Sequence, residues 1–146
     1  MPHSPRIYGG RYWILESGLG TLSTANLAEG TAQVVTRLPG FTRGLDFRRN
    51  IAFVGLSQVR ESATFSGIPI VDEPRNCGVW AVDIRTGQIV AYLRFEGIVQ
   101  EIFAVQVLPE ILYPDLINEA GELVDGSFVL PEERMKSGIT NNSQVK

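Results

Sequence analysis

The stretch NLAEGTAQVVTRLPGF, residues Asn26–Phe41, recurs without a gap 57 residues later as DIRTGQIVAYLRFEGI, residues Asp83–Ile98. Each copy begins with Asn or Asp, reaches a glycine four residues on (Gly30 and Gly87), and then enters an apolar segment. Asn and Asp bond their own backbone and glycine accepts a positive φ, so each copy predicts a hairpin turn between two strands. The repeat therefore predicts an architecture built from copies of one supersecondary unit.

A second match lies upstream of each turn. Tyr12–Ser17 (YWILES) resembles Ala52–Ser57 (AFVGLS), but at a shift of 40 residues. The difference of 17 residues predicts an insertion between the second and third strands of the second unit, within residues 58–76. This stretch contains two prolines and a glycine, which favours a long surface loop. Loops of that length in compact domains are commonly functional or disordered.

The strands expected from this pattern are short and separated by turn residues. They fall near 12–17, 21–27, 32–38, 43–48, 51–57, 78–84, 88–95 and 100–107. No long segment has a convincing helical period. We expect one β-repeat domain over residues 1–135 and a polar, disordered tail over 136–146, with His3 in a mobile N-terminal segment.

The fold class predicted is all-β, in antiparallel four-strand units. A unit of about 40–50 residues is typical of β-propeller blades, and the chain encodes two such units and a partial third. A small β-sandwich or barrel is the alternative, because propellers have about four to eight blades. In either architecture we expect Trp80 and Phe103, each in an apolar strand, to be buried between sheets.

Composition limits the class of partner. The chain has 146 residues and a formal net charge of -3, which gives no electrostatic reason to expect nucleic acid or an anionic membrane as partner. The first residues lack the apolar run of a signal peptide, and no segment approaches the ~20 apolar residues of a membrane span. The one cysteine, Cys77, cannot form an internal disulfide and is expected to be buried. These features favour a cytoplasmic protein.

Residue types for familiar metal or catalytic chemistry are scarce. His3 is the single histidine and Cys77 the single cysteine, so neither a zinc cluster nor a Ser-His-Asp or Cys-His site is expected. The sequence Gly18-Leu19-Gly20 opens no helix and predicts a turn rather than a phosphate-binding loop. We therefore expect no metal and no cofactor.

Five segments also carry a family resemblance. They are Leu38–Phe47 (LPGFTRGLDF), Ala52–Ser62 (AFVGLSQVRES), Cys77–Asp83 (CGVWAVD), Arg94–Gly97 (RFEG) and Val99–Pro109 (VQEIFAVQVLP). Together they resemble a bacterial family of conserved, propeller-like proteins of unknown function, over residues 5–131. The resemblance implies that the chain matches the C-terminal part of a longer propeller-like domain. It implies no activity.

The strand order brings one set of connecting segments to the same end of the sheets. Consecutive antiparallel strands reverse direction, so the second-to-third connection and the connection from the fourth strand to the next unit emerge together. The candidate ligand-binding face is formed by Arg43, Gln58, Arg60, Glu61, Gln100 and Glu101. We expect Arg43, Arg60 and Glu61 on loops, with Arg43 and Gln100 at the mouth of a central channel.

Two interpretations of this face stay open. In one, Arg43 pairs with Asp46 or Glu61 and Gln100 caps loop backbone, so the role of the face is structural. In the other, Arg43 and Arg60 bind a small anionic ligand, because guanidinium groups suit carboxylate and phosphate.

The favoured functional hypothesis is a non-catalytic binding or assembly module, because no catalytic constellation is recognisable. The alternative is a lyase or hydrolase in which Glu61 or Glu101 acts as base and Arg43 stabilises an oxyanion. We also expect a homo-oligomer, most simply a symmetric dimer, or a protein partner. The reason is that the predicted edges Tyr12–Leu15 and Phe128–Leu130 carry neither charge nor proline.

Overall fold

The computed structural model describes residues 2–58 and 76–114. The chain divides into two compact units, Met1–Pro109 and Glu110–Lys146, and all the strands described belong to the first. Most of the predicted insertion, residues 59–75, lies outside the described ranges. Within those ranges, no helix is long and apolar enough to cross a membrane.

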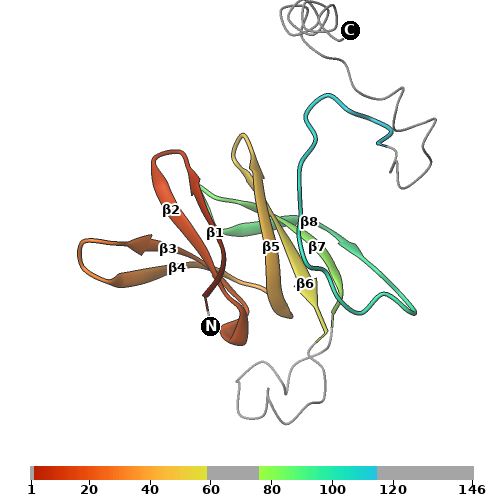
Figure 1. Ribbon diagram of the computed structural model, residues 1–146, viewed down its shortest axis with the longest axis horizontal. Helices are drawn as coiled ribbons and strands as arrows, with labels where there is room; N and C mark the ends of the chain where they lie inside the picture. Colours follow the sequence, from red (N-terminus) through yellow and green to blue (C-terminus); the bar gives the residue numbers. More distant parts are fainter. Residues whose placement is uncertain (1, 59–75, 115–146) are drawn as a thin grey trace, which may run out of the picture. The chain divides into compact units, whose positions relative to one another are not determined.

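Two four-stranded antiparallel sheets make up the first unit (Figure 1). Their strand orders are β1-β2-β3-β4 and β5-β6-β7-β8, so chain neighbours are sheet neighbours. The elements are β1 (Pro2–Tyr8), β2 (Arg11–Glu16), the 3-10 turn η1 (Ser17–Leu19), β3 (Thr21–Asn26), β4 (Thr31–Arg37), β5 (Phe41–Arg48), β6 (Ile51–Ser57), β7 (Gly78–Asp83) and β8 (Gln88–Arg94). The all-β antiparallel prediction is confirmed. The barrel alternative is excluded, because both sheets are open and no strand pairing among the described residues joins them.

The repeated turn has the same structure in both sheets. The side-chain oxygen of Asn26 accepts a hydrogen bond from the N–H of Ala28 at 3.1 Å, and the glycine that ends the turn has φ 65°. In the second sheet, Asp83 Oδ1 accepts from the N–H of Arg85 at 2.9 Å, and the matching glycine has φ 73°. The two hairpin turns predicted from the sequence repeat are therefore confirmed.

The N-terminal segment is a strand, which the sequence analysis missed. Its two prolines obscured the pattern, but an edge strand tolerates proline because its outer N–H groups need no partner. His3 is held in β1 rather than in a mobile segment, and its ring centroid lies 6.3 Å from that of Phe41. The expected edge Tyr12–Leu15 is also corrected, because it lies in β2 between β1 and β3. The other expected edge, Phe128–Leu130, lies outside the described residues.

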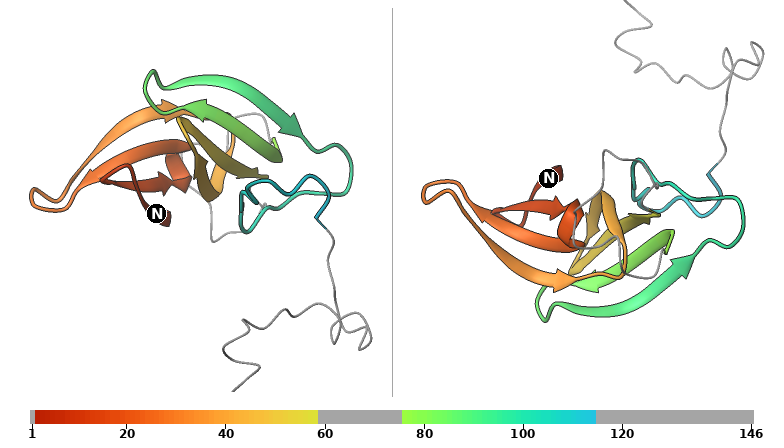
Figure 2. Two further views of the ribbon diagram at one scale, coloured as in Figure 1. Left: turned by 90° about the horizontal axis from the view of Figure 1, so that it is seen from above. Right: turned by 90° about the horizontal axis from the view of Figure 1, so that it is seen from below.

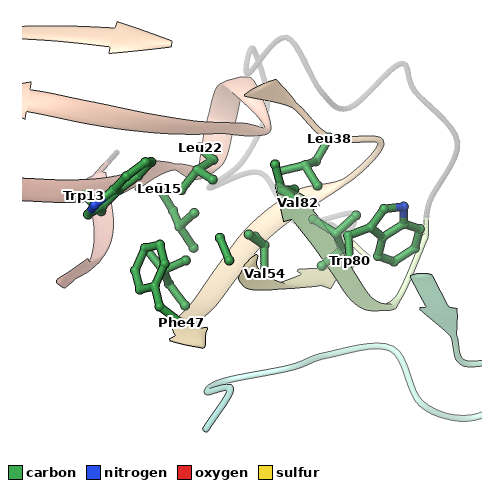
Figure 3. Close-up of a cluster of buried hydrophobic side chains, with 11 residues drawn as sticks. Trp13, Leu15, Leu22, Leu38, Phe47, Val54, Trp80 and Val82 are labelled. Atoms are coloured by element: carbon green, nitrogen blue, oxygen red, sulfur yellow. The ribbon is translucent and has the colours of Figure 1, made fainter. Parts of the chain in front are cut away.

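The hydrophobic core lies between the two sheets (Figure 3). Trp13 and Leu22 of the first sheet belong to the same buried cluster as Val54 and Val82 of the second, and none of the four is more than 1% exposed. Successive side chains of a strand point to opposite faces, so alternate residues of β2, β6 and β7 enter this core. Trp80 joins the cluster at 4% exposure, which confirms its predicted burial.

The first strands of the two sheets, β1 and β5, lie side by side (Figure 1). The N–H of Gly44 donates to the Ser4 hydroxyl oxygen at 2.9 Å. At the other end of the strands, the ring of Tyr8 stacks on that of Phe47 with centroids 4.6 Å apart. The Tyr8 hydroxyl also donates to the carbonyl oxygen of Arg49 at 2.8 Å. The sheets are therefore joined at their first strands as well as through the core.

Residues 100–107 run back beside the second sheet without forming a strand ladder (Figure 2). The predicted strand at this place and the predicted burial of Phe103 are both wrong, since Phe103 is 64% exposed. A strand is defined by a bonded neighbour, and no described segment pairs with residues 100–107. A large side chain on such a segment stays in water because no further strand or sheet covers it within the described residues.

Candidate functional site

The predicted site residues are distributed over a strand, two connections and the part of the chain that is not described. Arg43 lies within β5 and not on a loop, because that strand begins two residues before it. Gln58 and Gln100 are brought together, with the N–H of Gln58 donating to the carbonyl oxygen of Gln100 at 2.8 Å. Arg60 and Glu61 lie outside the described residues.

Arg43 contacts an aromatic ring. Its guanidinium carbon lies 4.5 Å from the centroid of the Phe103 ring, which is a cation–π distance. The ion pair expected with Asp46 does not form. Instead, Asp46 Oδ2 accepts from the N–H of Val107 at 2.6 Å and from the side-chain amide of Gln106 at 2.9 Å. Arg43 and Asp46 of β5 therefore both contact the segment 100–107.

A serine anchors the same segment to the end of β6. The Ser57 hydroxyl donates to the carbonyl oxygen of Ile102 at 3.1 Å and accepts from the N–H of Ile102 at 2.8 Å. In the first sheet Ser17, which corresponds to Ser57 at the 40-residue shift, donates to the carbonyl oxygen of Thr42 in β5 at 2.6 Å. A serine therefore holds the backbone of residues 100–107 at the end of β6, just as a serine after β2 holds the backbone of β5.

Glycine makes this close approach of the backbone possible. A Cβ atom on Gly55 would lie 2.8 Å from Ile102 Cγ2 and would overlap the carbonyl oxygen of Arg43. On Gly44, at φ 82°, it would lie 2.8 Å from the backbone nitrogen of Val105. Only glycine fits both positions without displacing backbone.

The second sheet presents an apolar face away from the core, here named the outer face. It consists of Phe53 of β6 and Val79 and Ala81 of β7, which alternate with core residues, and of Ala91 and Leu93, their neighbours in β8. Together with Tyr92 they line a depression of about 380 Å³. Leu93 is 59% exposed, while Phe53 and Val79 are partly buried. None of the described residues that line the depression is charged.

The equivalent positions of the first sheet are covered. Trp13 and Leu22 correspond to Phe53 and Val79 at the shifts of 40 and 57 residues, and they are 1% and 0% exposed beneath the second sheet. The outer face thus has the composition of a buried interface. The residue pattern of a single strand does not reveal this face, but aligning the buried positions of one unit with the other unit does.

Among the described residues, Cys77, Asp83 and Arg85 have shifted pKa values, and the carboxylate of Asp83 raises that of Arg85. Cys77 is 1% exposed, which confirms its predicted burial, and burial followed by the nearby charge of Glu101 raises the pKa of its thiol. The Arg85 guanidinium bonds both carboxylate oxygens of Asp83, at 3.1 and 2.7 Å, and lowers the pKa of Asp83 to about 2. The low pKa keeps this turn carboxylate ionised, so that it accepts the backbone bonds of the turn. In the described part of the chain, no three His, Cys, Asp or Glu residues form a group that could hold a metal ion.

Comparison with known proteins identifies a family. A family model described as Domain of unknown function (DUF4915) matches residues 1–117, which is more than half of the chain. No curated protein matches the chain, and neither does any solved structure. The resemblance to a family of unknown function is confirmed at this level. The chain therefore belongs to the family defined by the DUF4915 domain, a domain of unknown function.

Proposed function

We propose that this chain is a non-catalytic assembly module of the β-propeller type, and that two copies associate through the outer face of the second sheet. The two sheets are then consecutive blades, and residues 100–107 lie where the first strand of a third blade would lie. A cytoplasmic setting is proposed as well, because the buried Cys77 is a free thiol, which fits a reducing compartment.

One observation carries the proposal: the outer face repeats positions that are buried inside the same chain. Phe53 and Val79 stand where Trp13 and Leu22 stand in the first sheet, and those two are covered by the neighbouring sheet. Burial of apolar surface is the main favourable term in protein association. An apolar patch left in water on a folded protein is typical of an interaction site.

The enzyme alternative and the anionic-ligand interpretation both require Arg43 to meet a negative group. Its guanidinium instead lies on the ring of Phe103, and this contact supports the structural interpretation of Arg43. No observation in the described residues favours a reaction over assembly, so the assembly module is the function proposed.

The proposal is tested by the mass of the purified protein in solution. We expect light scattering to give twice the 16.1 kDa chain mass. The variant Leu93→Asp places a charge on the outer face and is expected to give a monomer. The variant Leu27→Asp is the matched control, because Leu27 is a leucine of similar exposure (66% against 59%) away from that face. A monomeric wild-type protein would refute the homodimer, and equal effects of the two variants would refute the assignment of the face.

A further inference from the structure

The segment 100–107 lacks a strand partner that the other first strands possess. In each sheet the first strand pairs with the strand that follows it, β1 with β2 and β5 with β6. By contrast, no backbone N–H or C=O group of residues Phe103–Gln106 bonds to any described residue. The edge strands β4 and β8 have one bonded edge each, whereas Phe103–Gln106 has two unbonded edges.

The segment is nevertheless held in place from one side. Ser57 bonds the backbone of Ile102, and Asp46 bonds the N–H of Val107, so both ends of Phe103–Gln106 are anchored. Ala104 and Phe103 are exposed between these anchors. An anchored, extended segment with free backbone groups is a template for an added strand, because little further ordering is needed when a strand binds.

The composition of the segment favours self-pairing. The stretch IFAVQVL, residues 102–108, has no charged side chain and no proline, which are the usual means of protecting a strand edge. Two copies of such a segment pair antiparallel about a two-fold axis without bringing like charges together.

We infer that Phe103–Val105 pairs antiparallel with the same residues of a second copy of this chain, so that Ala104 stands opposite its counterpart at the two-fold axis. The inference rests on the proposed homodimer and adds the contact that forms it. The strand added by the second copy then lies beside the second sheet in the position that β6 has beside the first sheet. Since β6 contributes Val54 to the core over Trp13 and Leu22, the added strand lies over the outer face at Phe53.

The first test places a charge at the centre of the edge. Ala104→Lys is exposed in the free chain and leaves the anchors unchanged, but it sets two lysines close together across the two-fold axis. We expect the dimer dissociation constant, measured by sedimentation, to rise about tenfold or more. Val34→Lys is the control, because Val34 is an exposed residue of β4, an edge strand of the first sheet, and the dissociation constant of this variant should match the wild type. A cooperative melt of Ala104→Lys confirms that the variant is folded.

The second test detects the pairing by cross-linking. In an antiparallel two-fold pair centred on Ala104, the variant Ala104→Cys brings two thiols within disulfide distance, while Cys77 is 1% exposed and stays reduced. Mild oxidation should yield a covalent dimer for Ala104→Cys and not for Val34→Cys. A dimer that survives Ala104→Lys and gives no cross-link, but is lost in Leu93→Asp, would overturn the edge pairing and leave the proposed homodimer standing. A monomeric wild-type protein would overturn both.

Discussion

Phe53 stands in β6 where Trp13 stands in β2, yet Trp13 is 1% exposed beneath the next sheet and Phe53 is only partly buried. The two residues occupy equivalent positions on equivalent strands. What differs is the surroundings: Trp13 packs in the core between the two sheets, whereas Phe53 lines an open depression on the outer face. This difference underlies both the proposed assembly and the predictions for stability.

The hydrogen bonds between Ser57 and the backbone of Ile102 should contribute measurably to stability. Ser57→Ala removes both hydrogen bonds to Ile102 and leaves its backbone N–H without that acceptor. We expect a loss of about 1–3 kcal/mol in the free energy of unfolding, measured by urea titration. Thr31→Ala, at an exposed and weakly bonded hydroxyl (3.5 Å), should change it by less than about 0.5 kcal/mol. Equal losses of stability in Ser57→Ala and Thr31→Ala would show that the hydrogen bonds of Ser57 have no special role.

The core between the sheets depends on one large aromatic residue of β7. Trp80 is 4% exposed, so Trp80→Ala leaves a cavity and should cost about 3–5 kcal/mol in the free energy of unfolding. Tyr113 is 92% exposed, and Tyr113→Ala should cost less than about 0.5 kcal/mol. Chemical denaturation measures both. A loss under about 1 kcal/mol for Trp80→Ala would contradict the assigned packing of the two sheets.

Gly55 should tolerate no side chain. In Gly55→Ala the new methyl group meets Ile102 Cγ2 at 2.8 Å and overlaps the carbonyl oxygen of Arg43. Overpacking of this kind is expected to cost about 1–3 kcal/mol in thermal or urea unfolding. Adding Ile102→Ala relieves the side-chain contact but not the backbone contact, so the double variant should recover only part of the loss. Full recovery of stability in the double variant would mean that the contact with the Arg43 carbonyl oxygen of β5 is not the cause of the loss.

The carboxylate of Asp83 should make stability depend on acid pH. Arg85 lowers its pKa to about 2 from the usual 3.8. The unfolded chain therefore binds its proton first as the pH falls, and the stabilisation by ionised Asp83 is complete above about pH 4 and lost as the pH falls toward 2.

Asp83→Asn should accordingly unfold more easily than the wild type at pH 6, with a difference that shrinks between pH 4 and pH 2. Urea titrations at several pH values measure this difference. Glu96→Gln is the control, because Glu96 forms an exposed ion pair with Arg94 outside the turn. A difference for Asp83→Asn that is independent of pH would refute the assigned pKa.

Local chemistry explains why part of the fold was predictable. The turns at Asn26 and Asp83 are made by residues that bond their own backbone, so their positions follow from residue type alone. The alternation that buries Trp80 is likewise a property of a single strand. β1 was not predicted because its prolines weaken the strand pattern. It is stabilised by pairing with β2, and that pairing cannot be inferred from the residues of β1 alone.

The candidate face was less predictable for the same reason. The residue pattern predicts Arg43 on a loop and, in one interpretation, an ion pair with Asp46 or Glu61. Arg43 and Asp46 instead contact the returning segment, Arg43 through Phe103 and Asp46 through Val107. These contacts join residues about 60 positions apart, and no residue type indicates such a partner in advance.

The sequence by itself determined the repeat, the hairpin turns and the alternation of apolar residues, because each depends on neighbours along the chain. Only the tertiary structure decided which apolar positions are covered. Trp13 and Phe53 read alike as large residues on a strand, but burial is a property of the space around a side chain. That space is filled for Trp13 by the second sheet, and for Phe53 the described residues leave it open.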